Sequence, residues 1–450
     1  MTTDNKASNT PQLQYDLFVF GDSLSDIGNS SKATLGLLPP SPPYFDGRFS
    51  NGPVAVETLA AQLGLPASLA TNFAVGGART GRENGNNNLV PGLRLDGLLD
   101  QIDRFKSQAS SLGAGAEDLY FIWAGANDLN QIGTSDPVAT INTAVSNIAA
   151  AVTSLVQSGA KNIVVVQTPN LGRVPASLQS GRLQDLTNLS NGFNAALESS
   201  LTALENSLAG SNIILSNLFP LSEQAAQNPA AFGFTNITDS YLNGLRPRDP
   251  AADPNQFFFW DQFHPTTRAH SFFADVFRNS VISGITDDIT RSGTAGPDKL
   301  VGFSGDDVLR GLGGADQLEG SPGNDTLVGG AQADTLTGGG NRDALTGGGG
   351  PDVLQGGPGR DQFIYSNPNH GRDTITDFQL GRDLIDLSSI FKRADYSRPN
   401  PFESYVRLVQ ANRGTVVRID SNGDASGGFK PLALLLNIEA NNLTASSFLV

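Results

Sequence analysis

The sequence predicts an α/β domain with a parallel sheet, followed by a smaller all-β domain made of short repeats. Up to about Ile285, short apolar runs alternate with longer segments of helical period. From Gly293 the composition changes, because 21 of the 51 glycines fall between Gly293 and Tyr365 and an aspartate recurs every nine residues. A chain of 450 residues is long enough for two such unequal domains.

Four apolar runs are the predicted strands of the first domain. They are YDLFVF (15–20), DLYFIWAG (118–125), NIVVVQTP (162–169) and NIILSNL (212–218). Between the second and third runs, apolar residues recur at spacings of four and three: Ile141, Val145, Ile148, Val152 and Leu155. This spacing gives one apolar stripe on a helix, as expected for a crossover between parallel strands.

Composition excludes several functional classes. A net charge of −15 and a pI near 4.6 argue against a nucleic-acid partner, which would require a basic surface. The absence of cysteine removes disulfides, thiolate metal sites and cysteine nucleophiles. We expect no transmembrane segment, because nowhere do 18 apolar residues run together, and no Sec-type signal peptide in MTTDNKASNTPQ (1–12).

A candidate nucleophile follows the first predicted strand, in GDSLSD (21–26). Ser23 lies where the strand turns through Gly21, and ligands of open α/β sheets bind at the carboxyl ends of strands. A serine or aspartate at this place also suits a helix N-cap, so this stretch alone leaves both interpretations open.

A serine nucleophile needs a base, and the chain has three histidines. His370 lies beyond the repeats, whereas His264 follows Asp261 by three residues in FFFWDQFHPTTRAH (257–270). In a turn this spacing lets the carboxylate reach Nδ1 and leaves Nε2 facing the serine. His270 has no acid at that spacing, and we expect it to be a partly exposed helix residue.

Acyl transfer also needs hydrogen-bond donors where the oxyanion forms. Two stretches offer them: NFAVGGART (72–80), in which Gly76 or Gly77 exposes a backbone N–H, and WAGANDLN (123–130), in which Asn127 follows a strand end. Each stretch by itself also suits an ordinary turn, and we expect Asp128 to cap or brace a loop.

Together these four stretches resemble the blocks of the GDSL, or SGNH, hydrolase family, in family order and over about residues 14–283. The resemblance implies Ser23 as nucleophile, Asp261 and His264 as the rest of a triad, and Gly77 and Asn127 as oxyanion donors. It also implies a three-layer domain with a flavodoxin-like parallel sheet, and catalysis without a cofactor.

The segments GRFSNGPVAVETLA (47–60) and FFWDQFHPT (258–266) further resemble the lipase-like branch of that family. This favours a carboxylic ester hydrolase acting on lipid-like or aryl esters, with transient contact to a lipid surface. The apolar, Pro-rich loop LGLLPPSPPYF (35–45) either borders an acyl pocket or is an ordinary packed loop. The alternatives are a carbohydrate acetyl esterase with the same triad and a calcium-binding surface or matrix protein whose hydrolase domain is idle.

The repeats keep an aspartate and, two residues later, a large apolar side chain in phase over eight copies. The aspartates are Asp298, Asp307, Asp316, Asp325, Asp334, Asp343, Asp352 and Asp361. Glycines allow tight turns, the apolar residues fill a narrow core, and carboxylates stacked turn on turn need a cation between them. Calcium suits oxygen ligands from carboxylates and exposed carbonyls, whereas a flexible linker would not keep this period.

The repeats resemble the RTX motif GGxGxDxUx, with Thr294, Phe303, Leu312 and Ser321 in place of the second glycine. This implies a parallel β-roll that binds structural calcium, and export to the extracellular medium by a type I secretion system. The segment 371–390 resembles the cap that follows such rolls, and LTASSFLV (443–450) is the expected secretion signal. The predicted divisions are a hydrolase domain (14–285), a linker (286–292), a β-roll (293–365) and a cap with the signal (366–450).

Overall fold

The computed structural model describes residues 15–450 except 90–91, 131–135, 209 and 425–426. The chain divides into two compact units, residues 15–281 and residues 282–450. The segment 1–12, for which the sequence predicts no signal peptide, lies outside the described residues.

The first unit is built on a parallel sheet whose strands follow the chain order: β1 (Leu17–Gly21), β2 (Leu119–Trp123), β3 (Asn162–Gln167) and β4 (Asn212–Asn217). All four predicted strands are confirmed. Beside β1, the backbone of Val19 accepts from Phe73 and donates to Thr71, so this segment adds to the free edge of β1. The sequence between β1 and β2 therefore returns to the sheet before it crosses to β2.

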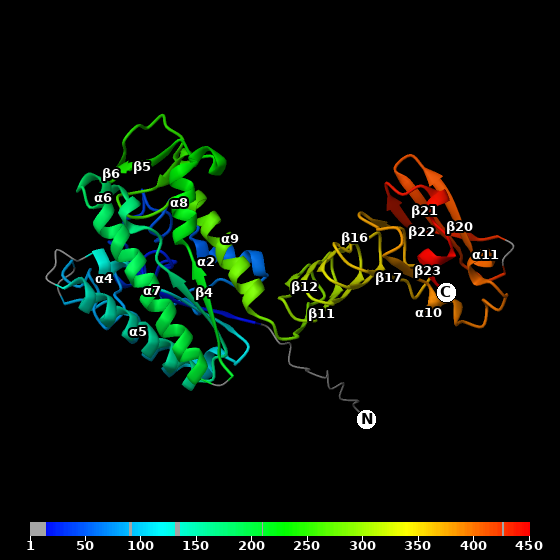
Figure 1. Ribbon diagram of the computed structural model, residues 1–450, viewed down its shortest axis with the longest axis horizontal. Coiled ribbons are helices and arrows are strands. Elements are labelled where there is room, and N and C mark those ends of the chain that lie inside the picture. The colour runs from blue at the N-terminus through cyan, green and yellow to red at the C-terminus, as the bar shows by residue number, and fades with distance from the viewer. Residues whose placement is uncertain (1–14, 90–91, 131–135, 209, 425–426) are drawn as a thin grey trace, which may run out of the picture. The chain divides into compact units, whose positions relative to one another are not determined.

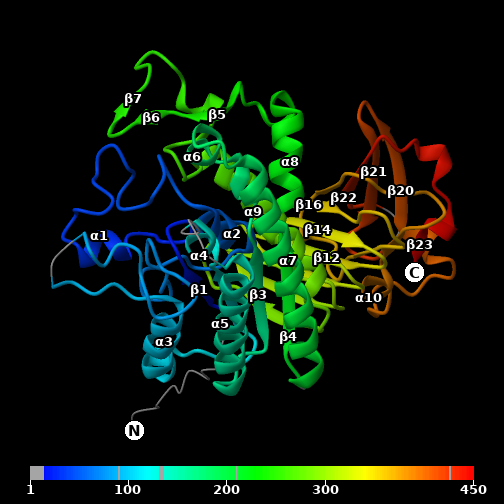
Figure 2. The same cartoon turned by 60° about the vertical axis from the view of Figure 1, so that its left-hand side comes forward.

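Helices cover both faces of this sheet, which confirms the three-layer α/β prediction. On one face α3 (Leu98–Leu112), α5 (Pro137–Gln157) and α7 (Leu183–Ser207) lie side by side (Figures 1 and 2). On the other face α9 (Thr267–Gly284) packs against the sheet, and Gln62 of α2 (Ala55–Leu63) donates to Asp275 of α9.

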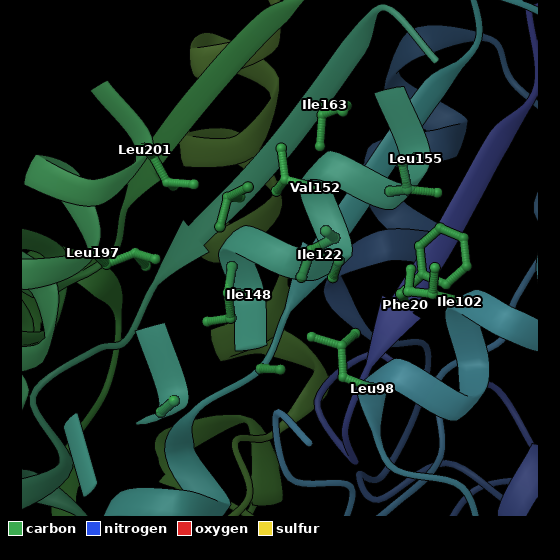
Figure 3. Packing of buried hydrophobic residues seen from close by; sticks show 14 of the residues in the cluster. Phe20, Leu98, Ile102, Ile122, Ile148, Val152, Leu155, Ile163, Leu197 and Leu201 are labelled. Atoms are coloured by element: carbon green, nitrogen blue, oxygen red, sulfur yellow. The ribbon is translucent and has the colours of Figure 1, made fainter. Parts of the chain in front are cut away.

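Alternation along the strands produces the two cores. Phe20 and Ile122 point toward α3 and α5 and join one continuous cluster (Figure 3). The intervening residues Phe121 and Trp123 point the other way and contact the ring of Phe277 on α9. Because β1, β2 and β3 are buried on both faces, their sequences are largely continuous apolar runs rather than alternating ones.

The predicted crossover helix is α5. The stripe residues Val145, Ile148, Val152 and Leu155 are buried in the same cluster, and Ile141 lies at its margin. Among the described residues α5 is also the helix long and apolar enough to span a membrane. Its apolar stripe is buried against the sheet, as in a core helix of a globular domain.

Shorter elements of this unit complete the edge where the strands end. They are α1 (Asn29–Ala33), α4 (Ala126–Asn130), α6 (Pro175–Gln179), α8 (Phe219–Gln227), β5 (Asn236–Ser240), β6 (Leu242–Asn243), β7 (Arg246–Pro247) and β8 (Phe257–Phe259). The helix α4 begins three residues after β2, and β8 leads into the turn that carries His264.

The second unit is a parallel β-roll, as predicted. Consecutive strands alternate between two sheets. Up to Ile364, paired strands are 18 residues apart, as Leu309 is from Leu327. The repeat leucines and Phe363 are buried in one cluster between the sheets. The strands are β9 (Thr290–Ser292), β10 (Lys299–Val301), β11 (Val308–Gly313), β12 (Gln317–Pro322), β13 (Thr326–Ala331), β14 (Thr335–Gly340), β15 (Ala344–Gly349), β16 (Val353–Gln355), β17 (Gln362–Ile364), β18 (Asp373–Ile375) and β19 (Leu384–Asp386). The pairings of β16 with β18 and of β17 with β19 span 21 and 22 residues.

Both sheets continue past the repeats. The antiparallel strands β20 (Val406–Ala411), β21 (Gly414–Asp420) and β22 (Phe429–Leu436) extend one sheet, because β22 pairs with β18. The strand β23 (Phe448–Leu449) pairs with β19 and extends the other sheet. The segment after the repeats therefore covers the open end of the roll core with Tyr405, Ile419 and Leu435.

Candidate functional site

Ser23 lies in the turn directly after β1. Gly21 ends the strand at a φ of 152°, and a Cβ there would collide with the backbone carbonyl of Trp123. The buried side chain of Gln101 holds the same point, because its amide group donates to the carbonyl of Gly21 and accepts from its N–H. This tight turn presents the hydroxyl of Ser23 at the carboxyl end of the sheet.

His264 and Asp261 lie in the turn after β8. The Nδ1 atom of His264 is 2.7 Å from Asp261 Oδ2, and its Nε2 atom is 2.9 Å from Ser23 Oγ. An ionised carboxylate only accepts, so Nδ1 carries the proton and Nε2 is free to accept from the serine hydroxyl. The structure therefore brings the three predicted triad residues into one hydrogen-bonded chain.

The charges in this chain are stabilised by its geometry. Burial by itself raises the pKa of Asp261, but the charge and hydrogen bond of His264 and a hydrogen bond from Tyr44 outweigh it and lower that pKa to about 2. Burial lowers the pKa of His264, whereas the Asp261 carboxylate raises it, and the net direction is upward. Asp261 is thus ionised at neutral pH and favours the imidazolium.

The three predicted oxyanion donors belong to Ser23, Gly77 and Asn127, which all line one cavity. Among the described residues no partner accepts from the backbone N–H of Ser23 or Gly77, whereas the N–H of Gly76 already donates to Asp26 and Ser30. Gly77 has a φ of 80°, in the left-handed region that favours glycine. Of the two glycines, Gly77 is the one with a donor to offer.

Asn127, in the first turn of α4, is the third predicted donor, and its amide already has partners in the structure. Its Nδ2 atom donates to the carbonyl of Ala78 at 3.0 Å and lies 3.4 Å from Asp22 Oδ2. Asp128 accepts from the N–H and hydroxyl of Thr80, so it braces the loop of Gly77 against α4, as predicted.

The sequence assigns no role to two residues near the site, Asp22 and Tyr44. Asp22 is buried beside Ser23, and burial raises the pKa of its carboxyl group to about 7. Tyr44 donates its hydroxyl to Asp261 Oδ2 at 2.6 Å. The only signal for Tyr44 was its position in the apolar loop 35–45, whose role the sequence left open.

The prediction for His270 was wrong. Its side chain is fully buried on α9, and Nδ1 accepts from the backbone N–H of Ala55 at 3.2 Å. Burial, with the nearby positive charge of His264, lowers the pKa of His270 to about 3. It is a neutral core residue, because the face of α9 that carries it packs inward.

A cavity of about 480 Å³ opens beside the three triad residues, and most of its wall is apolar. Leu38, Pro39 and Pro40 form part of this wall, so the loop 35–45 borders the pocket rather than packing as an ordinary connection. Phe263, half exposed, also lines the cavity next to the triad. The site combines an aligned serine with space for an apolar group.

The repeat aspartates form two ladders along the roll. In each ladder Oδ1 accepts from the backbone N–H of the aspartate 18 residues earlier, as Asp334 does from Asp316. The other oxygen, Oδ2, is buried without a hydrogen-bond partner in Asp316, Asp325, Asp334, Asp343, Asp352 and Asp361. A Cβ on the first glycine of such a turn, Gly329, would collide with Asp334 Oδ2 and with the carbonyl of Gly347.

Unpartnered buried carboxylate oxygens next to exposed carbonyls fit a hard cation such as Ca²⁺. Among the described residues no three acidic or histidine side chains cluster, so backbone carbonyls would have to supply the remaining ligands. Asp298 and Asp307 differ, because their Oδ2 atoms accept from the N–H groups of Thr294 and Phe303. Those residues replace the second glycine of the turn, and neither has a positive φ.

The fold and site define an α/β protein in which serine, histidine and aspartate form a hydrogen-bonded chain at the carboxyl edge of a parallel sheet. The chain belongs to the GDSL-like lipase/acylhydrolase family, whose model matches residues 17–277. A second model, the RTX calcium-binding nonapeptide repeat, matches residues 292–318, 319–354 and 337–366. Both family resemblances predicted from the motifs are therefore confirmed.

Curated relatives match the first unit. The chain is 29% identical over 308 residues to the phosphatidylcholine-sterol acyltransferase of Aeromonas hydrophila, covering 58% of this chain and 88% of that protein. It is 31% identical over 306 residues to the esterase EstA of Pseudomonas aeruginosa, covering 58% of this chain and 45% of that protein. A solved aryl esterase of M. smegmatis covers 60% of this chain and all of its own, with 16% identity and a TM-score of 0.35.

Proposed function

We propose that this chain hydrolyses carboxylic esters through an acyl-enzyme formed on Ser23. The observation that carries the proposal is the continuous hydrogen-bonded chain from Asp261 through His264 to Ser23, at the wall of an apolar cavity. A serine hydroxyl becomes a nucleophile only when a base can remove its proton, and this geometry supplies that base.

In the first step Ser23 Oγ attacks the ester carbonyl while His264 Nε2 takes the hydroxyl proton. The oxyanion of the tetrahedral intermediate accepts from the N–H groups of Ser23 and Gly77 and from the Asn127 amide. As the intermediate collapses, Nε2 gives its proton to the departing alkoxide, and the alcohol leaves. Water then attacks the acyl-enzyme with His264 again as base, which releases the acid and restores Ser23.

A lipid-like or aryl ester is the proposed substrate class. The cavity has a volume of about 480 Å³, which exceeds what an acetyl group would fill, and its wall is largely apolar. Leu35 is 93% exposed and Leu37 is 66% exposed on the loop that borders it, and such side chains suit transient contact with a lipid surface. These features disfavour the carbohydrate acetyl esterase, and the aligned triad disfavours an idle hydrolase domain.

The repeats are proposed to bind calcium as a structural ion outside the cell. The six aspartates with unpartnered Oδ2 atoms would hold it together with carbonyls of the glycine-rich turns. Calcium bound there neutralises stacked carboxylates, so binding free energy adds to folding free energy. Because the chain carries RTX repeats, we propose export by a type I secretion system. We also propose domains at 14–285, 293–365 and 366–450. Of the linker predicted at 286–292, residues 290–292 form β9 and belong to the roll.

The test is hydrolysis of p-nitrophenyl esters from acetate to palmitate by the full chain in calcium, with Ser23→Ala as the control. We expect turnover that the substitution abolishes, with a maximum at acyl chains longer than acetate. A maximum at acetate would favour the acetyl esterase. Unchanged turnover in Ser23→Ala would contradict the proposed mechanism.

A further inference from the structure

The carboxylate of Asp261 has one hydrogen-bond partner that comes from a distant part of the chain. Tyr44 donates its hydroxyl to Oδ2 at 2.6 Å across a separation of 217 residues. The other donors belong to the turn of Asp261 itself: the N–H groups of Phe263 and His264 and the imidazole Nδ1. Within the described residues, Tyr44 is therefore the external anchor of this carboxylate.

Tyr44 is itself held in place by packing around the triad. Its ring meets Trp260, the residue before Asp261, edge-on at 6.5 Å and meets Phe49 at 6.4 Å. Phe49 in turn contacts the imidazole of His264, with the ring centres 5.1 Å apart. The phenol thus belongs to the aromatic shell that fixes both the acid and the base.

The Tyr44 hydroxyl stays protonated and therefore remains a hydrogen-bond donor to Asp261. Burial and the neighbouring Asp261 carboxylate both raise the pKa of Tyr44, so the hydroxyl keeps its proton under working conditions. A charge-assisted O–H bond of this length is strong and directional. It fixes the rotation of the carboxylate that accepts the hydrogen bond from His264 Nδ1.

We propose that Tyr44 is a positioning residue for the triad, acting through Asp261 on the imidazole of His264. Tyr44 closes the loop whose earlier residues Leu38, Pro39 and Pro40 line the cavity, so the wall that meets the substrate and the anchor of the acid are one segment. Alignment of the triad therefore depends on the conformation of this loop. The proposal rests on the proposed function.

The experiment compares Tyr44→Phe with wild type in the full chain, using p-nitrophenyl butyrate. The substitution keeps the ring and removes the donor, so we expect kcat to fall about tenfold with little change in KM. Without the hydrogen bond from the phenol, the negative charge of Asp261 stabilises the imidazolium more strongly and raises the pKa of His264. The acid limb of kcat/KM then moves to higher pH. Wild-type kcat, or a lower kcat with an unmoved acid limb, would overturn the proposal.

Tyr241→Phe is the matched control. Tyr241 stacks on the other side of the same cluster, with its ring centre 5.0 Å from that of Trp260, and is buried with it. Loss of its hydroxyl should leave kcat and the pH profile unchanged. If Tyr241→Phe moved both as Tyr44→Phe does, the effect would belong to the aromatic cluster and not to the hydrogen bond.

A double-mutant cycle with Asp261→Asn keeps the test decisive if Tyr44→Phe is less stable. If Tyr44 acts through the carboxylate, its removal should cost almost nothing once Asp261 is gone. An equal loss in both backgrounds would contradict the proposal. Ser23→Ala separates the two levels: activity that survives it refutes the proposed function, whereas loss there with an unaffected Tyr44→Phe refutes only the role of Tyr44.

Discussion

His264 Nε2 lies 2.9 Å from Ser23 Oγ, although 241 residues separate the two in the chain. The first residue follows β8 and the second follows β1, so their contact depends on two turns at the same edge of the sheet. Each turn is fixed separately, by Gln101 at Gly21 and by Tyr44 at Asp261.

The pH dependence of hydrolysis should report His264. Protonated Nε2 cannot accept the serine proton, so kcat/KM falls as pH drops through the pKa of His264. The Asp261 carboxylate raises that pKa above the ordinary value of 6.5 despite burial, and we expect the acid limb to have its midpoint above 6.5.

Asp261→Asn removes the cause of that rise while the burial that lowers the pKa remains. We therefore expect the acid limb to move to lower pH, with kcat reduced by about 10⁴-fold. A pH–rate profile of both proteins checks this. An acid limb at the same pH in both would show that Asp261 does not set the pKa of the base.

Loss of the Asn127 amide should slow the chemical step. Asn127→Ala removes one oxyanion donor, and we expect kcat to fall by about 10²- to 10³-fold with KM nearly unchanged. Steady-state kinetics on p-nitrophenyl butyrate measure this. Asn127→Asp keeps the shape but replaces the donor with an acceptor, so full activity in that variant would exclude the oxyanion role.

The apolar cavity should set the acyl-chain preference. Leu178 of α6 lines the cavity and belongs to neither the triad nor the predicted oxyanion donors. Leu178→Trp would reduce the space for an acyl chain. We expect the ratio of kcat/KM for octanoate to that for acetate to fall by about tenfold, with acetate turnover retained. An unchanged ratio would mean that acyl chains do not occupy this cavity.

Calcium binding should depend more on the six aspartates whose Oδ2 atoms have no partner than on Asp298 and Asp307. Asp334→Asn removes an unpartnered buried oxygen, and we expect the calcium needed for half-maximal stabilisation of the roll to rise by about tenfold. Asp298→Asn is the matched control, because its Oδ2 already accepts from Thr294.

Thermal melts at graded calcium concentrations, with and without chelator, compare the two variants with wild type. Chelation should lower the melting temperature of the wild-type roll, because unscreened carboxylates repel one another. Equal effects of the two substitutions would contradict the distinction between aspartates with an unpartnered Oδ2 and those whose Oδ2 accepts a hydrogen bond.

The parallel strands of the first unit, its crossover helix and the repeats of the second unit are predictable from residue patterns alone. The four apolar runs predict buried parallel strands because helices cover both faces of the sheet. Side chains on either face, such as Phe20 on one and Phe121 on the other, must therefore be apolar. The nine-residue period specifies the roll because each repeat supplies one leucine to the core and one aspartate to a ladder. The residues of the candidate triad were identifiable because their motifs are local and follow the family order.

Which side chains contact one another depends on how distant segments pack. Tyr44 has no motif, and its contact with Asp261 arises where a long loop crosses a turn formed 217 residues later. His270 is a polar residue but is buried, because it lies on the face of α9 that packs into the core. The N–H of Gly76 has hydrogen-bond partners and that of Gly77 has none among the described residues, although both residues are glycines. Likewise, Oδ2 of Asp298 and Asp307 accepts a hydrogen bond that the later repeat aspartates lack. In both cases the partners depend on local backbone angles, which the residue type alone does not fix.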